Sequence, residues 1–142
     1  MIELKGYSYW KVKLKISELA SIAQVSVKTI RYYEQIGLLS APNRSDNGYR
    51  FYQQKDIETL IFIRRCRELN IALDDIKRLV DTQQDPKSSC ALVDNIIAQQ
   101  LARIQQTQRE LALLEQSLAA LASCCQNHQI KDCSILHTLK SS

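Results

Sequence analysis

Glycine and proline are scarce in this chain, and their scarcity excludes several classes of protein. The 142 residues include three glycines and two prolines, so the sequence has no glycine-rich loop of the kind that cradles phosphates in nucleotide-binding enzymes. No apolar run approaches the roughly 18–20 residues that a membrane-spanning helix needs. The first 15 residues mix lysines and a glutamate with aromatics, which does not match a secretory signal. We therefore expect a cytoplasmic protein that has no membrane partner.

Cysteine is present in an odd number, which argues against a framework of structural disulfides. The five are Cys66, Cys90, Cys124, Cys125 and Cys133. In a reducing cytosol, clustered cysteines more often bind metal or carry redox chemistry. Cys66 lies inside an amphipathic stretch, so we expect a buried core thiol there.

Basic residues are concentrated in one half of the chain. Residues 1–70 hold twelve lysines and arginines against seven acidic residues, whereas residues 71–142 hold seven against eight. The first half is therefore the candidate for contact with a polyanion such as DNA. A basic face that contacts only solvent would give the same composition.

Two short helices are predicted near the start of this basic half. Residues 16–23 show helical spacing of apolar side chains, with Ser17 as the expected N-cap. Ser26 is expected to cap a second helix from Val27 to about Ile36, which Gly37 then ends. Two helices joined by a tight turn predict a helix-turn-helix.

A β-hairpin is predicted after these helices. Asn47-Gly48 is a strong signal for a tight turn, and Arg44 and Arg50 stand on either side of it. A hairpin that carries arginines beside a helix-turn-helix is typical of a wing. Two more helices are expected at residues 53–69 and 73–83, the latter burying Ile76, Leu79 and Val80.

A long helix is predicted over residues 91–123, which contain no glycine or proline. Its apolar stripe is formed by Ile97, Leu101, Ile104, Leu111, Leu114, Leu118 and Leu121. The spacings of three, four and seven are those of a coiled-coil seam. A helix this long cannot bury the stripe against one small domain, so we expect a homodimer.

The motif order in the first half resembles the MerR family of transcription regulators. The resemblance rests on Thr29-Ile30-Arg31-Tyr32-Tyr33-Glu34, Gly37-Leu38-Leu39, Arg44, Gly48-Tyr49-Arg50-Phe51-Tyr52 and Asp56. It extends from about Leu14 to Leu139 and is most similar to the zinc-responsive branch, with the cadmium/lead-responsive branch close behind. One departure is Asn70-Ile71, which stands where the family often has Gly-Phe.

The resemblance implies a mainly α fold: a winged helix-turn-helix domain, a long antiparallel dimerisation helix and a C-terminal metal-binding loop. We divide the chain into an N-terminal extension (1–12), a DNA-binding domain (13–85), a dimerisation helix (86–123) and a metal-binding loop with a short terminal helix (124–142). The candidate DNA contacts are Thr29, Arg31, Tyr32, Tyr33, Arg44, Arg50 and Tyr52, with Tyr33 favoured for phosphate. Glu34 is expected to have a positioning role because its charge repels phosphate.

The candidate metal ligands are Cys90, Cys124, Cys125, His128 and Cys133. Thiolate and imidazole suit Zn(II), Cd(II), Pb(II) and Cu(I) and disfavour Mg(II) or Ca(II). Cu(I) is content with two thiolates, so the larger ligand set here favours a divalent ion. Cys90 and Cys124 stand at opposite ends of a helix about 50 Å long, so only antiparallel pairing brings them together across a dimer.

The identity of the ion stays open at this point. The resemblance implies Zn(II), with two ions per site and Cys90 bridging them. The loop that carries His128 is one residue shorter than the zinc branch suggests, and without this ligand a three-thiolate site would suit Hg(II), Pb(II) or Cd(II).

The resemblance also implies a mechanism. The dimer binds a palindromic, double-stranded promoter with an overlong spacer, and metal shifts the DNA-binding heads so that RNA polymerase can use the distorted DNA. The alternatives are an iron–sulfur sensor, which usually needs four close cysteines, a thiol enzyme, and a DNA-organising protein with structural zinc. We expect no catalytic residues.

Overall fold

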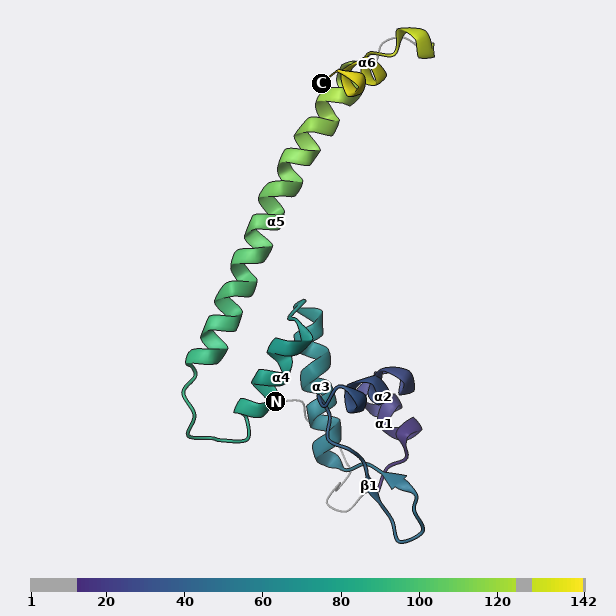
Figure 1. Ribbon diagram of the computed structural model, residues 1–142, viewed down its shortest axis with the longest axis vertical. Helices are drawn as coiled ribbons and strands as arrows, with labels where there is room; N and C mark the ends of the chain where they lie inside the picture. The colour runs from purple at the N-terminus through teal and green to yellow at the C-terminus, as the bar shows by residue number, and fades with distance from the viewer. Residues whose placement is uncertain (1–12, 125–128, 142) are drawn as a thin grey trace. The chain divides into compact units, whose positions relative to one another are not determined.

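The computed structural model describes residues 13–124 and 129–141, and it divides the chain into two compact units. The first unit extends to Val93 and the second begins at Asp94. In chain order the first unit holds α1, α2, a two-stranded hairpin, α3 and α4 (Figure 1). Most of α5, a 3-10 turn and α6 belong to the second unit.

Helix α1 spans Ile16–Ala23 and begins two residues earlier than a Ser17 cap would allow. The N-cap is Lys15, whose backbone N–H donates to the Glu18 carboxylate at 2.7 Å. The prediction of Ser17 as N-cap was therefore wrong. A carboxylate at the third position of the helix accepts a hydrogen bond from the N-cap N–H, and its negative charge interacts favourably with the helix dipole.

Helix α2 spans Val27–Gln35 and has the predicted boundaries. The Ser26 hydroxyl accepts a hydrogen bond from the Thr29 backbone N–H at 3.1 Å, which caps the first turn. Gly37 follows the helix at φ +76°, a conformation that a side chain disfavours. Both predicted signals, the serine cap and the glycine stop, are confirmed.

The predicted hairpin is also confirmed and projects away from the helices of the first unit (Figure 1). Strand β1, Asn43–Arg44, pairs antiparallel with β2, Arg50–Phe51. The turn closes with Ser45 N–H donating to the Tyr49 carbonyl at 2.8 Å, and Gly48 has φ +79°. We call residues 43–51 the wing.

The core of the first unit forms where α3, Gln54–Glu68, packs against α1 and against α4, Leu73–Thr82. Its largest fully buried side chains are Leu19, Ile30, Tyr52, Ile57, Leu60, Ile63, Ile71 and Ile76. Asp56 is buried too, and its carboxylate accepts from the Gln53 N–H at 2.7 Å to cap α3. Leu79 is buried as predicted, whereas Val80 is only half-buried, because it lies toward the edge of the packed face.

Asn70 ends α3 in the left-handed conformation, at φ +58°. Its N–H donates to the Arg67 carbonyl at 2.9 Å, and the next residue, Ile71, is buried. Asparagine tolerates this conformation better than other residues that carry a β-carbon. This positive φ explains why the MerR family, which the sequence resembles, often has glycine here.

Asn70→Ala is expected to destabilise the protein by about 1 kcal/mol, because alanine adopts φ > 0 at a steric cost. Asn70→Gly should equal or exceed the wild-type stability. Urea unfolding at matched protein concentration would measure both variants. An alanine variant as stable as the glycine variant would contradict the assignment of backbone strain to this residue.

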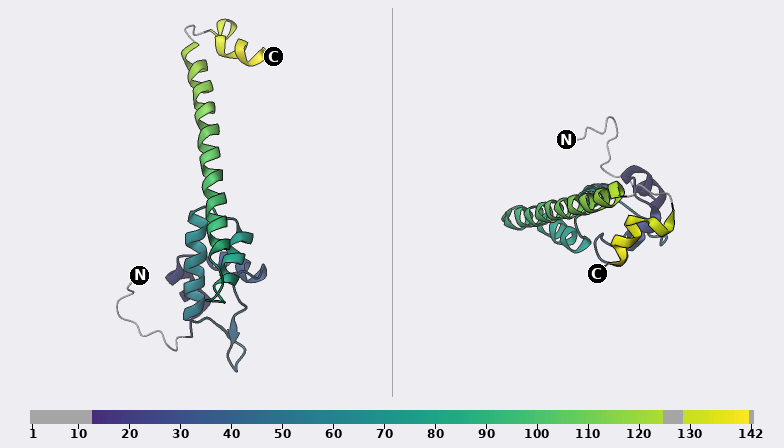
Figure 2. Two further views of the ribbon diagram at one scale, coloured as in Figure 1. Left: turned by 90° about the vertical axis from the view of Figure 1, so that its left-hand side faces the viewer. Right: turned by 90° about the horizontal axis from the view of Figure 1, so that it is seen from above.

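Helix α5, Ala91–Cys124, is one unbroken helix of 34 residues (Figure 2). Its apolar stripe is exposed along the described chain at Ile97, Leu101, Ile104, Leu111, Leu114 and Leu118. A 3-10 turn, Ile130–Asp132, and α6, Ser134–Lys140, follow. The predicted mainly α class is confirmed. No helix in the described part is long and apolar enough to cross a membrane.

Candidate functional site

Helix α2 presents its candidate DNA contacts on two different sides. Arg31 and Tyr32 are exposed, with 49% of Tyr32 accessible, whereas Tyr33 packs in the core at 8%. Thr29 is half-buried, and its hydroxyl lies 2.7 Å from the Ser26 hydroxyl that caps the helix. Burial therefore favours Arg31 and Tyr32 as DNA contacts. Tyr33, the predicted phosphate contact, is more buried than its neighbour Tyr32.

Tyr52 does not have the exposed position that a DNA contact requires. Its side chain is 0% exposed, and its hydroxyl donates to the Glu34 carboxylate on α2. Burial, this hydrogen bond and the charge of Glu34 raise the pKa of Tyr52 far above its usual range, so the phenol stays protonated. Tyr52 is therefore removed from the set of candidate DNA contacts, and its role is internal. Tyr52 directly follows β2, and its side chain turns inward although the neighbouring Arg50 is exposed.

Two arginines face each other across the wing. Arg44 and Arg50 are partners in the strand register, and both are exposed. Like charges directly opposite one another destabilise a strand pair. Among the described residues, the ion pairs are Arg64 with Glu68 and Arg78 with Asp75, so neither wing arginine is neutralised by a carboxylate there. Such a pair suits an anionic ligand that binds both guanidinium groups.

Arg64 of α3 supports the helix-turn-helix in a way that sequence reasoning missed. Its guanidinium donates to the Ala23 carbonyl at 3.1 Å and to the Gln24 side chain at 2.7 Å. Gln24 lies in the tight turn between α1 and α2, at φ +56°. Arg64 thus fixes the turn that sets the angle between the two helices. No local pattern signals this contact, because about 40 residues separate the partners.

The described thiols differ in exposure in a way that separates a core residue from candidate ligands. Cys66 is buried as predicted, and burial raises the pKa of its thiol, which keeps it neutral and a poor metal ligand. Cys90 is exposed directly before α5, and Cys133 is half-buried at the start of α6.

The remaining candidate ligands cannot be placed in the same way. Cys125 and His128, together with the side chain of Cys124, lie outside the described residues. Within residues 13–123 and 129–141, no cluster of three metal-ligating side chains occurs. The metal site therefore stays a prediction from sequence.

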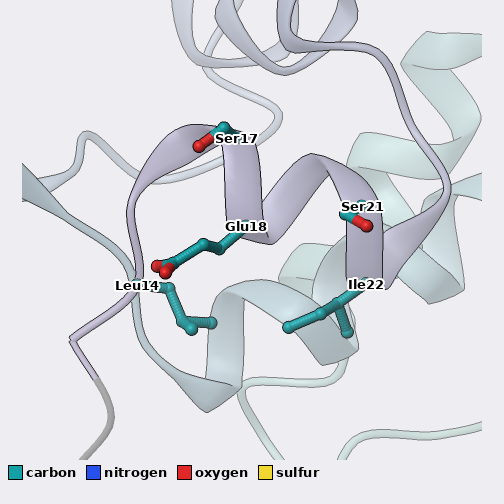
Figure 3. Close-up of a pocket in the computed structure, with 5 residues that line it drawn as sticks. All are labelled: Leu14, Ser17, Glu18, Ser21 and Ile22. Atoms are coloured by element: carbon teal, nitrogen blue, oxygen red, sulfur yellow. The ribbon is translucent and has the colours of Figure 1, made fainter.

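A shallow depression lies beside α1 (Figure 3). It is lined by Leu14, Ser17, Glu18, Ser21 and Ile22. The Glu18 carboxylate is already engaged in capping Lys15. The other polar groups are two serine hydroxyls from the same helix, and none of the lining residues is a cysteine or histidine that could act as nucleophile or base.

Comparison with known proteins gives a consistent result over most of the chain. Residues 14–83 match the family described as MerR HTH family regulatory protein, and residues 57–121 match the one described as MerR, DNA binding. An HTH-type transcriptional regulator of Pseudomonas aeruginosa is 38% identical over 128 residues, covering 90% of this chain and 97% of that protein.

Two further relatives have names that mention metals. The mercuric resistance operon regulatory protein of Bacillus cereus is 34% identical and covers 90% of this chain and 98% of its own length. The crystal structure of the transcription regulator PbrR691 from Ralstonia metallidurans in complex with lead(II) superimposes with a TM-score of 0.82 at 34% identity. The match covers 89% of this chain and 98% of that one.

The family matches, the relatives and the winged helix-turn-helix agree with one another. This chain belongs to the MerR family of helix-turn-helix regulators, which are DNA-binding transcription factors and not enzymes.

Proposed function

We propose that the chain is a metal-responsive transcription regulator that binds a double-stranded promoter as a homodimer. On binding a divalent soft metal ion, it activates a metal-efflux or detoxification gene by distorting the promoter for RNA polymerase. The observation that carries the proposal is the order of features in a family member: an exposed thiol before α5, an exposed apolar stripe along α5, and a further thiol after it.

The exposed stripe of α5 supports the dimer. Monomeric proteins rarely leave a long row of large apolar side chains in water, and the stripe has coiled-coil spacing. Antiparallel pairing would place Cys90 of one subunit beside the end of the partner's α5, where Cys124 stands in the sequence. Each metal site would then contain thiolates from both subunits.

A site shared between subunits gives metal binding a direct effect on dimer geometry. The ion can shift the equilibrium between two arrangements of the DNA-binding heads only if it binds one arrangement more tightly. Ligands from two chains create that difference, because their separation depends on how the chains are packed. The heads would then untwist the promoter spacer by way of the contacts of α2 and the wing.

Zn(II) is the first candidate for the effector. Cys90, Cys124, Cys125, His128 and Cys133 together offer thiolates and an imidazole, the ligand types that zinc prefers. Pb(II), Cd(II) or Hg(II) bound by three thiolates is the second candidate. The similarity to a regulator crystallised with lead(II), and to a mercuric resistance regulator, favours this alternative.

Competitive titration of the full-length, reduced protein with Zn(II), Cd(II), Pb(II), Hg(II) and Cu(I) would test the proposal. Transcription from an operator-bearing promoter would be followed in parallel. Two zinc ions per site, bound more weakly after His128→Ala, would support the zinc sensor. One lead or cadmium ion per site, indifferent to His128→Ala, would support the three-thiolate sensor. Failure of all five ions to bind tightly would contradict metal sensing and leave DNA binding unaffected.

A further inference from the structure

Tyr52 lies at the point where three segments of the DNA-binding unit meet. It directly follows β2 of the wing and precedes Gln53, the N-cap of α3. Its backbone also pairs with Leu14, with the Tyr52 N–H donating at 2.8 Å and the Leu14 N–H donating back at 2.9 Å. The base of the wing is thereby attached to the segment that enters α1.

The side chain of Tyr52 also contacts α2, the second helix of the helix-turn-helix, which we call the recognition helix. Its ring is completely buried, and its hydroxyl donates to the carboxylate of Glu34. Glu34 belongs to α2, three residues after Arg31 and two after Tyr32. A hydrogen bond to a charged acceptor is stronger than one between neutral groups, and partial burial protects it from competing water. This contact connects α2 with the wing across 18 residues of sequence.

The wing needs such a contact because its hairpin is too short to be stable by itself. Each strand is two residues long, and an isolated two-stranded hairpin is at best marginally stable in water. The facing pair of Arg44 and Arg50 weakens it further. Lys13 lies 4.8 Å over the ring of Phe51, which also holds the base of the wing. The direction in which the wing points therefore depends on its base, where Tyr52 is the fully buried side chain.

We propose that the hydrogen bond between Tyr52 and Glu34 is a positioning contact that sets the wing relative to the recognition helix. It holds Arg44 and Arg50 of the wing at a fixed position relative to Arg31 of α2, so that the wing and α2 bind phosphates of one half-site together. Neither Tyr52 nor Glu34 touches DNA in this arrangement. The inference rests on the DNA-binding half of the proposed function and is independent of the metal.

The test compares full-length variants on an operator selected by the wild-type protein from a random pool of duplexes. Tyr52→Phe removes the hydroxyl alone and keeps the ring in the core. We expect about a tenfold loss of operator affinity. The slope of log K against log salt should flatten by about two, as for one lost phosphate contact in each subunit. Hydroxyl-radical footprints should lose protection at the flanks that the wing covers and retain it where α2 binds.

Three further variants separate positioning from general damage. Glu34→Gln keeps a hydrogen-bond acceptor, so this variant should retain most of the wild-type operator affinity and the wild-type salt slope. Glu34→Ala should match Tyr52→Phe, and the double variant Tyr52→Phe/Glu34→Ala should lose little more than either alone. Arg50→Ala is the comparator, since it removes a wing contact directly and should produce the same footprint as Tyr52→Phe.

The possible results are distinct. If Tyr52→Phe has the wild-type salt slope and footprint, the positioning role is overturned, even when thermal stability or total affinity falls. If Glu34→Gln is as defective as Glu34→Ala, the hydrogen bond is not the relevant interaction. If the wild-type protein enriches no duplex from the pool, the proposed DNA-binding function fails before the contact is tested.

Discussion

Leu111→Asp in α5 is expected to convert the dimer to monomers and to lower operator affinity by about 1,000-fold or more. Leu111 is exposed in the described chain and lies in the middle of the apolar stripe. In an antiparallel dimer, each aspartate would be buried without a partner in the coiled-coil seam, which costs several kcal/mol per charge. A single head has only one half-site to bind, so its affinity approaches the non-specific level.

Gln106→Asp is the matched control for this variant. Gln106 is exposed on the same helix, about 200° around the axis from Ile104, and its side chain forms hydrogen bonds with Arg109 and Glu110 of the same helix. The charge added there should leave both the dimer and the operator complex intact. Sedimentation velocity and a gel-shift titration would measure the two quantities. A Leu111→Asp protein that stays dimeric would contradict the assignment of the stripe to the dimer interface.

Cys90→Ala is expected to weaken binding of the effector metal by more than about 100-fold and to abolish metal-dependent transcription. Loss of a residue that only orients a ligand typically costs 10–100-fold in metal affinity, and loss of a ligand itself should cost more. Operator binding without metal should stay at the wild-type level, because Cys90 lies outside α2 and the wing. Competition with a chelator of known affinity would give the metal affinity, and transcription in vitro would give the response.

Cys66→Ala provides the same substitution at a buried thiol that the proposal does not use. We expect unchanged metal affinity and a modest loss of stability from the small cavity in the core. Equal metal affinity in Cys90→Ala and the wild-type protein would remove Cys90 from the site. The assignment of the shared, two-subunit site would then have no support, although the thiols after α5 could still bind metal.

The boundaries of the helix-turn-helix and the wing could be predicted because their signals are local. Ser26 caps the helix that it precedes, Gly37 ends that helix, and Asn47-Gly48 forms the turn between strands a few residues long. Each of these residues acts through its own backbone conformation or through a hydrogen bond to a near neighbour. The boundaries that these residues set can therefore be predicted without knowledge of the tertiary fold.

The contacts that fail to follow from sequence are those between distant segments. Leu14 pairs with Tyr52, and Arg64 donates a hydrogen bond to Gln24 in the turn between α1 and α2. Neither contact produces a periodic pattern in the sequence. The sequence predicts Tyr52 as a DNA contact because it stands beside the wing, whereas packing buries its side chain. The expected Ser17 cap is also wrong, because the helix begins at Ile16 and the Glu18 carboxylate accepts a hydrogen bond from the Lys15 N–H.

The facing arginines of the wing make salt act in opposite directions on the free protein and on its complex. In the free protein, dissolved ions screen the repulsion between Arg44 and Arg50, so the hairpin should be more ordered as ionic strength rises. In the complex, phosphates neutralise the same pair, and added salt competes with them. At low ionic strength we therefore expect the wing to be more ordered on DNA than in the free protein. Part of the binding free energy is then used to order this hairpin, which lowers affinity for correct and incorrect sequences alike.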